Sequence, residues 1–555
     1  MSVPLSTSLR RSSRMPSIPA RLADEQASLR LQQQDFRDLL RALQDSENKY
    51  DIEDTSDEDL SIVEHSVEEI KKEKVRTSQI QLTWTTKSRR VQLPNFSSCF
   101  GSFTILKDPL SLFQLFITPS LLDLIAKNTT AYAHYKGASD NWCTTMEELQ
   151  SFIAVHICMG ICRYPQVAMY WSQENRHPWI SECMTRDRFK ELLRYFHISH
   201  PHDVSSIAQP LGKIRPLLDS LASSFPSWCR PGQEMTVDEA MVGFKGRSVI
   251  KQYIPLKPTK WGYKIWCLTS LNYLFAFEIF EGTKRLRSEN SPEDALLRLV
   301  RPYFNRHHIV FMDRLFTSPS LLSTLLENGT YGCGTVRKDR VGLSAEFKHA
   351  GNDMKKGTIK TWQAGKMGAL VWRDRKVVHM LSTHISPTKT QRILRQEEKK
   401  KTIVPSMVLD YNKFKGGVDT VDQMHENYSI GRKSMKWWPR LVWWCIDLCI
   451  HNAYILHCMN SINPMTNLQF REHLMHQLLE KYGQPCRDRG RKRQRSQDSN
   501  ENQHWPIHVS KKSRCWYCNH KKNIRTDTHI KCKVCDKYLC VDPCFELYHT
   551  TCADE

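Results

Sequence analysis

The sequence lacks a continuous apolar run long enough to cross a membrane. Its best candidate, Leu441–Leu456, is too short and is interrupted by Asp447, His451 and Asn452. The N-terminal region also lacks the apolar segment that is typical of secretory signals. We therefore expect this run to be a buried helix, and we expect neither a membrane nor a secretory destination. Residues 1–22 have no acids and weakly resemble a mitochondrial transit peptide, whereas the rest of the chain points to the nucleus.

Acidic residues are scarce relative to basic ones. Fifty-nine Asp and Glu oppose 80 Lys and Arg, and the formal net charge is +21. The excess would be larger without residues 45–70, which hold eleven acids and one base. Such a charge favours a polyanionic partner, and nucleic acid is the obvious one because neutralising phosphates releases counterions. Composition alone is equally compatible with a basic ribosomal or chromatin protein or a membrane-surface binder.

No signal peptide accompanies the 19 cysteines, which argues against a disulfide-stabilised secreted fold. Seven of them lie within residues 515–552, and their spacing predicts two tetrahedral zinc sites. The expected ligands are Cys515, Cys518, Cys532, Cys535, Cys540, Cys544, His549 and Cys552. Cys552 lies three residues from the end, so His520 is the alternative eighth ligand. So small a segment has little core, and the metal must supply folding energy. A redox-sensitive or disulfide cluster is the competing interpretation.

Composition shifts and hydrophobic periodicity divide the chain into segments. We expect a disordered tail with an acidic stretch (1–100), helical texture from Asp108, an α/β region from Glu234, a basic and polar stretch (341–402), renewed helical texture from Asp422, a basic linker (486–514) and a cysteine-rich module (515–555). The fold class is therefore multidomain α+β.

The same periodicity locates individual elements within these segments. Helices are predicted over Thr145–Ile161, Thr185–Phe196, Pro216–Phe225, Asp294–Val300, Asp422–Cys458 and Asn467–Tyr482. Strands are predicted over Met235–Phe244, Gly262–Leu271, Leu274–Ile279 and Ile309–Met312, with a hairpin formed by Ala369–Trp372 and Val377–Ser382.

Three aspartates stand where the acids of a polynucleotidyl transferase would be expected. Asp238 lies within the first predicted strand, Asp313 directly follows a buried strand, and Asp419 lies after a glycine pair and before a helix. Phosphodiester cleavage is commonly assisted by two Mg²⁺ ions roughly 4 Å apart, and Mg²⁺ prefers one or two carboxylates per ion. Taken alone, however, an Asp after a strand is more often a turn or cap residue.

Longer motifs make the interpretation more specific. The segments VDEAMVGFKGR, KPTKWGYKIW, FMDRLFTSPSLL, YGCGTVRKDR, VLDYNKFKGGVDTVDQM and SMKWWPRLVWW resemble, in this order, the piggyBac transposase family. The resemblance runs from about Asp108 to the C-terminus. It assigns Asp238, Asp313 and Asp419 to the family's catalytic positions and Asp422 to its fourth acid position.

Two neighbours of these acids need separate comment. Glu239 would point to the other side of the strand from Asp238, so we interpret it as structural. Arg314 departs from the family, which often has Asn directly after the second acid. A guanidinium at this position could pair with Asp313 and compete with metal, or could contact a DNA phosphate.

The resemblance also implies an architecture and a function. It implies an RNase H-like catalytic core (234–340 and 403–430) that an insertion domain interrupts, a discontinuous helical dimerisation and DNA-binding domain (101–233 and 431–485), and a zinc domain that recognises transposon ends. It implies a cross-brace that pairs Cys515 and Cys518 with Cys540 and Cys544, and Cys532 and Cys535 with His549 and Cys552. The expected function is Mg²⁺-dependent cut-and-paste DNA transposition at TTAA targets by a nuclear homodimer. The alternative is a domesticated DNA-binding protein that does not cut.

Several basic residues are candidate DNA contacts. Arg337, Lys338 and Arg340 lie on a predicted loop, in a stretch that the family uses to hold target DNA. Lys436 and Arg440 accompany tryptophans, which suits stacking and phosphate binding, although tryptophans at such density usually build a core. Lys257, Lys260 and Lys264 form a similar patch. The basic run Arg489–Arg495 is typical of both nuclear import and DNA binding.

Overall fold

A computed structural model of the chain describes residues 82–96, 100–203, 209–255, 257–282, 291–351, 353–395, 400–483 and 504–551. The chain divides into two compact units, residues 1–486 and residues 487–555. The predicted run Arg489–Arg495, the acidic stretch and residues 1–81 lie outside the described residues.

A mixed sheet of nine strands forms the centre of the larger unit. Its first five strands, in order across the sheet, are β6 (Tyr273–Ile279), β5 (Trp261–Ser270), β3 (Glu234–Gly243), β7 (Ile309–Met312) and β8 (Tyr331–Thr335). β3, β5 and β6 are antiparallel neighbours, whereas β7 and β8 run parallel to β3. All four residues of β7 are buried, as expected for a strand that is covered on both faces. The predicted strands are therefore confirmed to within about two residues at each end.

The sheet continues into the segment that was expected to be an insertion domain. β11 (Val377–Ser382) pairs antiparallel with β8, and β10 (Met367–Arg373) and β9 (Ile359–Ala364) follow it. The predicted hairpin is confirmed, but it extends the central sheet instead of forming a separate layer. Leu370 and Trp372 of β10 pack in one apolar cluster, and Ala369 and Val371 pack in another. This alternation shows that the extension buries both of its faces.

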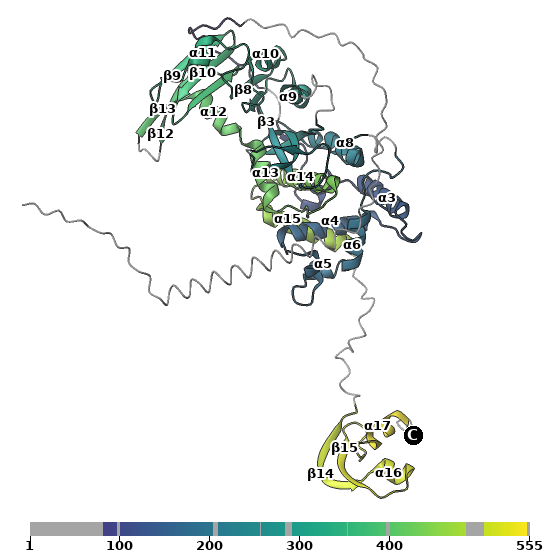
Figure 1. Ribbon diagram of the computed structural model, residues 1–555. Helices are drawn as coiled ribbons and strands as arrows, with labels where there is room; N and C mark the ends of the chain where they lie inside the picture. The colour runs from purple at the N-terminus through teal and green to yellow at the C-terminus, as the bar shows by residue number, and fades with distance from the viewer. Residues whose placement is uncertain are drawn as a thin grey trace, which may run out of the picture. The chain divides into compact units, whose positions relative to one another are not determined.

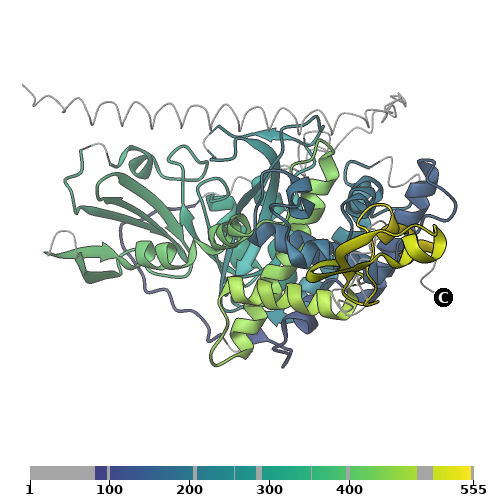
Figure 2. The same ribbon diagram turned by 90° about the horizontal axis from the view of Figure 1, so that it is seen from below.

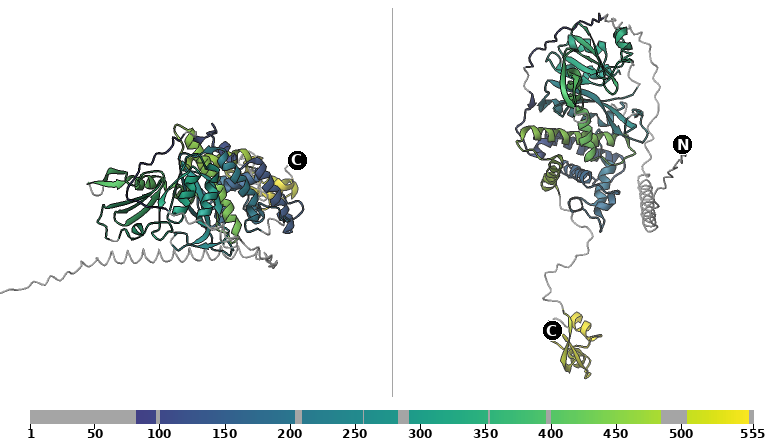
Figure 3. Two further views of the ribbon diagram at one scale, coloured as in Figure 1. Left: turned by 90° about the horizontal axis from the view of Figure 1, so that it is seen from above. Right: turned by 90° about the vertical axis from the view of Figure 1, so that its left-hand side faces the viewer.

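Helices pack around and beyond this sheet (Figures 1, 2 and 3). They are α2 (Pro109–Gln114), α3 (Pro119–Tyr135), α4 (Met146–Ile161), α5 (Pro178–Ser181), α6 (Arg186–Tyr195), α8 (Arg215–Ser224), α9 (Pro292–Val300), α10 (Pro319–Glu327), α11 (Ala345–His349), α12 (Ser406–Phe414), α13 (Gly417–Asn427), α14 (Trp437–Asn460) and α15 (Asn467–Tyr482). Threonine side chains cap the N-termini of α3, α4, α6 and α15, which satisfies backbone N–H groups at these helix starts. In Figure 1, α4, α5, α6 and α15 gather at the end of the unit opposite β9 and β10.

α14 is the buried helix that the apolar run predicts. Among the described helices it is the one whose length and composition would allow a membrane crossing, yet 89% of that stretch is buried inside the protein. Its polar side chains have partners: the Asn452 amide donates to the Leu274 carbonyl and accepts from the Leu274 N–H. These contacts tie α14 to β6.

The helical texture predicted over Asp422–Cys458 belongs to two helices, α13 and α14. Pro439 lies in the first turn of α14. A proline is tolerated there, whereas inside a continuous helix it would remove a hydrogen bond and clash with the preceding turn.

Two short pairs of strands flank the sheet. β1 (Gly101–Ser102) pairs with β2 (Cys229–Arg230), and β12 (Thr390–Arg395) pairs with β13 (Lys400–Pro405). β4 (Gln252–Tyr253) adds to β5.

Part of the tail that was expected to be disordered belongs to the folded unit. Thr85 forms an antiparallel bridge with Gln363 of β9, the outermost strand, and the Trp84 indole N–H donates to the Gly342 carbonyl at 2.8 Å. Residues 82–96 therefore cover an edge that would otherwise expose backbone donors and acceptors.

The smaller unit contains β14 (Pro506–Arg514), α16 (Trp516–Lys521), β15 (Asp527–Cys532) and α17 (Cys544–Thr551). β14 pairs antiparallel with β15, and Pro506 lies opposite Cys532. Residues 504–514, expected to be part of the basic linker, thus belong to the cysteine-rich unit.

Gly417 lets the first turn of α13 lie close to the sheet. A Cβ added at Gly417 would lie 2.4 Å from the Thr269 hydroxyl oxygen and 3.5 Å from the Thr236 Cβ. The stretch before it is also tied to β3, because the Thr236 hydroxyl donates to the Phe414 carbonyl at 2.6 Å. α13 therefore needs glycine at this contact.

We expect Gly417→Ala to lower the free energy of unfolding by about 1–3 kcal/mol, because the added methyl group overpacks the contact between α13 and β5. Gly416→Ala is the matched control, since a Cβ there meets nothing within 4 Å. Urea unfolding of the two variants checks this expectation. Equal stability losses would show that the contact is not tight.

Candidate metal centres and nucleic-acid contacts

The four predicted catalytic acids come from three elements that meet at one end of the sheet. Val237 of β3 lies opposite Met312 of the parallel strand β7. The next residues along these two strands are Asp238 and Asp313, so register alone places them side by side. Asp313 follows the last residue of β7, at the carboxyl end where ligand sites commonly form in such sheets.

Asp419 and Asp422 are both on α13. Asp419 was expected before the helix, but it lies in the first turn. Residues three apart share a helix face, and the charge of Asp419 raises the pKa of both Asp238 and Asp422. The four carboxyl groups are therefore close enough to interact electrostatically.

Burial and mutual repulsion dominate the electrostatics of this cluster. The pKa of Asp238 is raised to about 7, mainly because the carboxyl is buried and further because Asp313 and Asp419 lie nearby. Burial likewise raises the pKa of Asp422 to about 7, and burial raises the pKa of Asp313. Asp238 and Asp422 thus resist ionisation beside two other acids. Ionising all four carboxyl groups is unfavourable in free energy unless a cation shares the site.

Backbone N–H groups orient two of the carboxylates. The Glu239 N–H donates to Asp238 Oδ1 at 2.7 Å, and the Leu315 N–H donates to Asp313 Oδ1 at 2.8 Å. The hard oxygen donors that remain fit Mg²⁺, which keeps several waters and takes one or two carboxylates per ion. Among the described residues no three of these carboxylates lie within 4.8 Å of one another.

Glu239, interpreted from the sequence as structural, is held by two lysines. Burial raises the pKa of Asp313 and the charge of Glu239 raises it further, so Glu239 also lies near the acids. Its Oε2 lies 2.8 Å from the Lys264 ammonium, and its Oε1 lies 3.6 Å from the Lys257 ammonium. Lys257 also donates to the Glu239 carbonyl oxygen at 3.0 Å. Its charge lowers the pKa of Asp238, Asp313 and Asp422, so it lies beside the acids. The sequence placed Lys257 in a DNA-contact patch, and only the fold brings it to this cluster.

Arg314 is exposed, and within the described residues no ion pair joins it to Asp313. The second acid is instead supported by Arg340. One Arg340 nitrogen lies 3.2 Å from a Glu293 carboxylate oxygen and another donates to the Leu315 carbonyl. Arg340 thereby braces the loop after Asp313, and its role as a DNA contact stays a prediction.

Arg440, another predicted arginine contact, also binds backbone carbonyls, and its role as a DNA contact stays a prediction. Its guanidinium is largely buried and donates to the carbonyls of Gly243, Gly431 and Arg432, and burial lowers its pKa. Lys436 precedes α14, and its charge contributes to lowering the pKa of the buried His197. Arg337 and Lys338 are exposed, and Arg337 forms a 2.6 Å surface ion pair with Asp339, which contributes little to stability.

The smaller unit brings eight Cys and His side chains into two groups of four. Cys515, Cys518, Cys540 and Cys544 form one group, and His504, Cys532, Cys535 and His549 form the other. Within each group the ligand atoms lie within 4.8 Å of one another. Tetrahedral zinc with bonds of about 2.3 Å to sulfur requires ligand separations of roughly 3.8 Å, so both groups fit the ion. The groups are interleaved along the chain, as a cross-brace requires.

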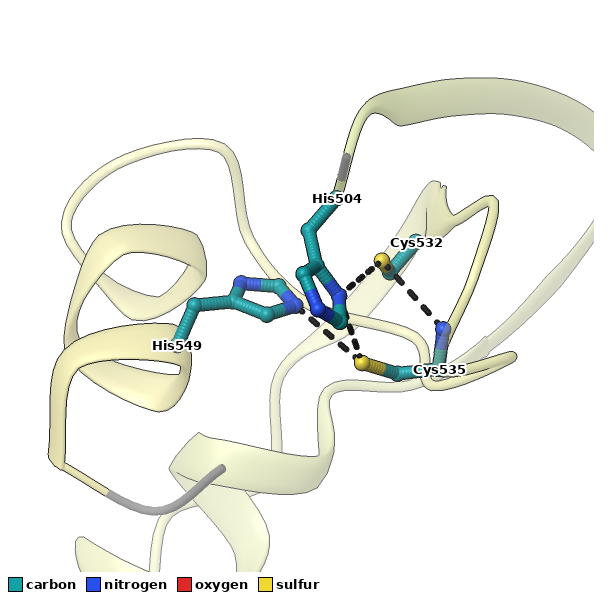
Figure 4. A group of neighbouring side chains, drawn as sticks. All are labelled: His504, Cys532, Cys535 and His549. Atoms are coloured by element: carbon teal, nitrogen blue, oxygen red, sulfur yellow. Dashed lines mark hydrogen bonds between the residues drawn. The ribbon is translucent and has the colours of Figure 1, made fainter. Parts of the chain in front are cut away.

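His504 is the ligand that the sequence did not reveal (Figure 4). Its Nδ1 lies 2.8 Å from the Cys535 sulfur and 3.5 Å from the Cys532 sulfur. The expected eighth ligand, Cys552, lies outside the described residues, and the alternative, His520, stacks on Trp516 away from both groups. His504 lies 28 residues before Cys532, and only the pairing of β14 with β15 joins them.

Neighbouring thiols affect the chemistry of both groups. The pKa of Cys535 and the pKa of Cys540 are raised to about 11, mainly by burial and also by the adjacent thiols. Zinc binds thiolates, so its binding must displace the thiol protons. The affinity for the metal should therefore decrease as the pH is lowered.

Known proteins resemble this chain in sequence. A family model described as Transposase IS4 matches residues 108–454, and one described as DDE_Tnp_1-like zinc finger matches residues 499–550. PiggyBac transposable element-derived protein 3 of Homo sapiens is 30% identical over 469 residues, covering 81% of this chain and 77% of that protein. PiggyBac transposable element-derived protein 2 of Homo sapiens is 28% identical, covering 79% and 78%.

Solved structures show the same fold. The structure of a piggyBac transposase synaptic complex with hairpin DNA matches with a TM-score of 0.63 at 23% identity. The match covers 80% of this chain and 98% of that chain.

The zinc ligands can be tested by stoichiometry. We expect two zinc ions per wild-type chain and about one after His504→Ala, because three remaining ligands bind zinc far more weakly than four. Cys552→Ala and His520→Ala should retain two. Metal analysis of the purified variants decides the matter. Loss of zinc from Cys552→Ala with retention in His504→Ala would reverse the assignment.

The acidic cluster predicts a pH dependence. Between about pH 4 and pH 7 the folded protein keeps a proton on Asp238 that the unfolded chain releases, so stability should fall as pH rises. In EDTA, the Asp238→Asn variant should lose roughly 2–4 kcal/mol less free energy of unfolding than wild type over this pH range. Mg²⁺ at pH 7.5 should raise the melting temperature of wild type but not of the variant. If wild type and Asp238→Asn show the same pH dependence of the free energy of unfolding in urea, the proposed electrostatic cluster is contradicted.

Proposed function

Because this chain belongs to the piggyBac transposase family, we propose that it is a metal-dependent DNA transposase that cuts and rejoins DNA strands. The observation that carries the proposal is the convergence of Asp238, Asp313, Asp419 and Asp422 from two parallel strands and a helix. The strand order β6-β5-β3-β7-β8 supports an RNase H-like core around them.

In this proposal the four carboxylates would hold two Mg²⁺ ions. Such ions would supply activation of a water or a 3′-hydroxyl group and stabilisation of the leaving oxygen of the phosphodiester. The Leu315 N–H donates to one oxygen of Asp313 and so orients this carboxylate. Arg340 and Glu293 hold the loop on which that N–H lies.

The proposed substrate is double-stranded DNA, with cleavage at transposon ends and insertion at TTAA targets by a homodimer in the nucleus. The net charge of +21 supports a polyanionic partner. Arg337 and Lys338, which are exposed, are the favoured phosphate contacts near the acids, with Lys436 as a further candidate. The two-zinc unit is proposed to recognise the transposon ends.

A second candidate is a domesticated DNA-binding protein without nuclease activity. The names of both human relatives describe them as derived from transposable elements. Arg314 stands where the family often has Asn, which favours this alternative.

Asp419→Ala separates the two candidates. For a transposase it should abolish excision from a donor plasmid while DNA affinity stays or rises slightly, because a negative charge near phosphate is lost. Asp353→Ala, which replaces an exposed acid in another part of the unit, is the control and should retain excision. If wild type binds DNA without cutting and Asp419→Ala behaves identically, the domesticated binder is correct.

The basic residues make a separate prediction. Replacing Arg337 and Lys338 with Ala should weaken target joining and reduce the salt dependence of binding by about one log unit per lost phosphate contact. Arg340→Ala should instead lower stability, because Glu293 and the Leu315 carbonyl lose their partner. Salt-titrated binding and thermal melting on the same variants distinguish these outcomes. A reduced salt slope for Arg340→Ala at unchanged stability would confirm it as a DNA contact.

A further inference from the structure

The C-terminal end of α13 is held by three helices at once. A Cβ added at Gly160 of α4 would lie 2.7 Å from the Tyr428 carbonyl, so the chain after α13 passes directly against α4. Arg163, just beyond α4, donates to the Glu426 carbonyl at 3.0 Å. α14 and α15 contribute the remaining contacts.

Asp447 of α14 is the centre of these contacts. Its side chain is fully buried, and its Oδ2 accepts the Ile430 N–H at 3.0 Å. Its Oδ1 accepts from the Arg471 guanidinium of α15 at 2.9 Å. The Nδ1 of His425, in the last turn of α13, lies 3.1 Å from Oδ2. One buried carboxylate thus joins α13, the segment after it, and α15.

Arg471 completes the network. Its side chain is 1% exposed, and besides Asp447 it contacts the Tyr428 carbonyl at 3.3 Å and the Asn467 side-chain oxygen at 3.2 Å. A buried ion pair seldom adds net stability, because desolvation of the two charges offsets their attraction. Stability alone therefore does not explain the pair, whereas its directed bonds specify one position for the turn at residues 428–430.

We propose that His425, Asp447 and Arg471 form a clamp that positions α13, and through it Asp419 and Asp422, relative to Asp238 and Asp313. His425 lies one helical turn beyond Asp422 on the same helix face, so its contact with Asp447 sets the rotation of the helix that carries both acids. Gly417 holds the other end of α13 against β5. The inference rests on the proposed metal site, and in it His425 is a positioning residue that acts through Asp447.

The clamp makes a prediction about metal affinity. His425→Ala should weaken Mn²⁺ binding, measured by electron paramagnetic resonance on the full-length protein without DNA, by roughly tenfold, as is usual when a group supporting metal ligands is lost. His425→Asn should restore most of it, since the amide nitrogen can donate to Asp447 from a similar position. His473→Ala on α15 replaces an exposed histidine and should leave the affinity unchanged.

Amide hydrogen exchange supplies a readout that does not depend on metal. His425→Ala should accelerate exchange at residues 417–427 at least tenfold and leave β3 and β7 unaffected. The double variant Asp447→Leu with Arg471→Met removes both buried charges together, which spares the fold the cost of one unpaired charge. It should melt near the wild-type temperature and show the same local acceleration.

Failure of the clamp and failure of the proposed metal site give different results. Unchanged exchange in α13, or acceleration throughout the sheet, overturns the clamp. If wild type and Asp238→Asn bind Mn²⁺ equally, the proposed metal site fails, and exchange alone then decides whether the clamp positions α13. Weaker Mn²⁺ binding by His425→Ala that His425→Asn does not restore also overturns it.

Discussion

The repulsion among four carboxyl groups at one end of a sheet is the constraint on which the larger unit depends. Burial raises the pKa of Asp238 and of Asp422 to about 7, so the folded chain must hold these groups together against their tendency to separate. It does so with rigid elements. Two come from adjacent parallel strands, whose register is set by backbone hydrogen bonds, and two come from a helix that is packed at both ends.

The surrounding architecture can be understood as support for these elements. Arg340 and Glu293 hold the loop after Asp313, and the glycine contact of α13 with β5 brings the third acid close to the first. The helical part of the unit reaches the same site through α14 and α15, because Asp447 binds the turn that follows α13. A change in the helical part would therefore be transmitted to the acids through one helix, which links the proposed DNA-binding region to the proposed chemistry.

The smaller unit is stabilised in a different way, because it has little apolar core. Its apolar cluster is small and includes three of the metal-binding cysteines, so metal must contribute the folding energy that a larger core would supply. His504 enters from the segment before β14, and zinc thereby fastens the strand pair to α17, which carries His549. Folding of the smaller unit would therefore depend on the ions.

The sequence by itself determined what depends on short stretches of chain. Periodicity located β3, β5, β6 and β7, and the motifs identified the four acids. Six paired cysteines and His549 were seven of the eight side chains that form the two metal-binding groups. The tertiary structure decided whatever depends on contacts between distant segments. The sequence did not reveal that the guanidinium groups of Arg340 and Arg440 donate to backbone carbonyls, because a run of basic residues has the same sequence whether it faces solvent or a carbonyl. His504 and Asp447 were missed as functional positions, because their partners lie 28 and 24 residues away. Spacing along a chain encodes local geometry, whereas the pairing of strands and the packing of helices, which bring such residues together, arise only when the whole fold is formed.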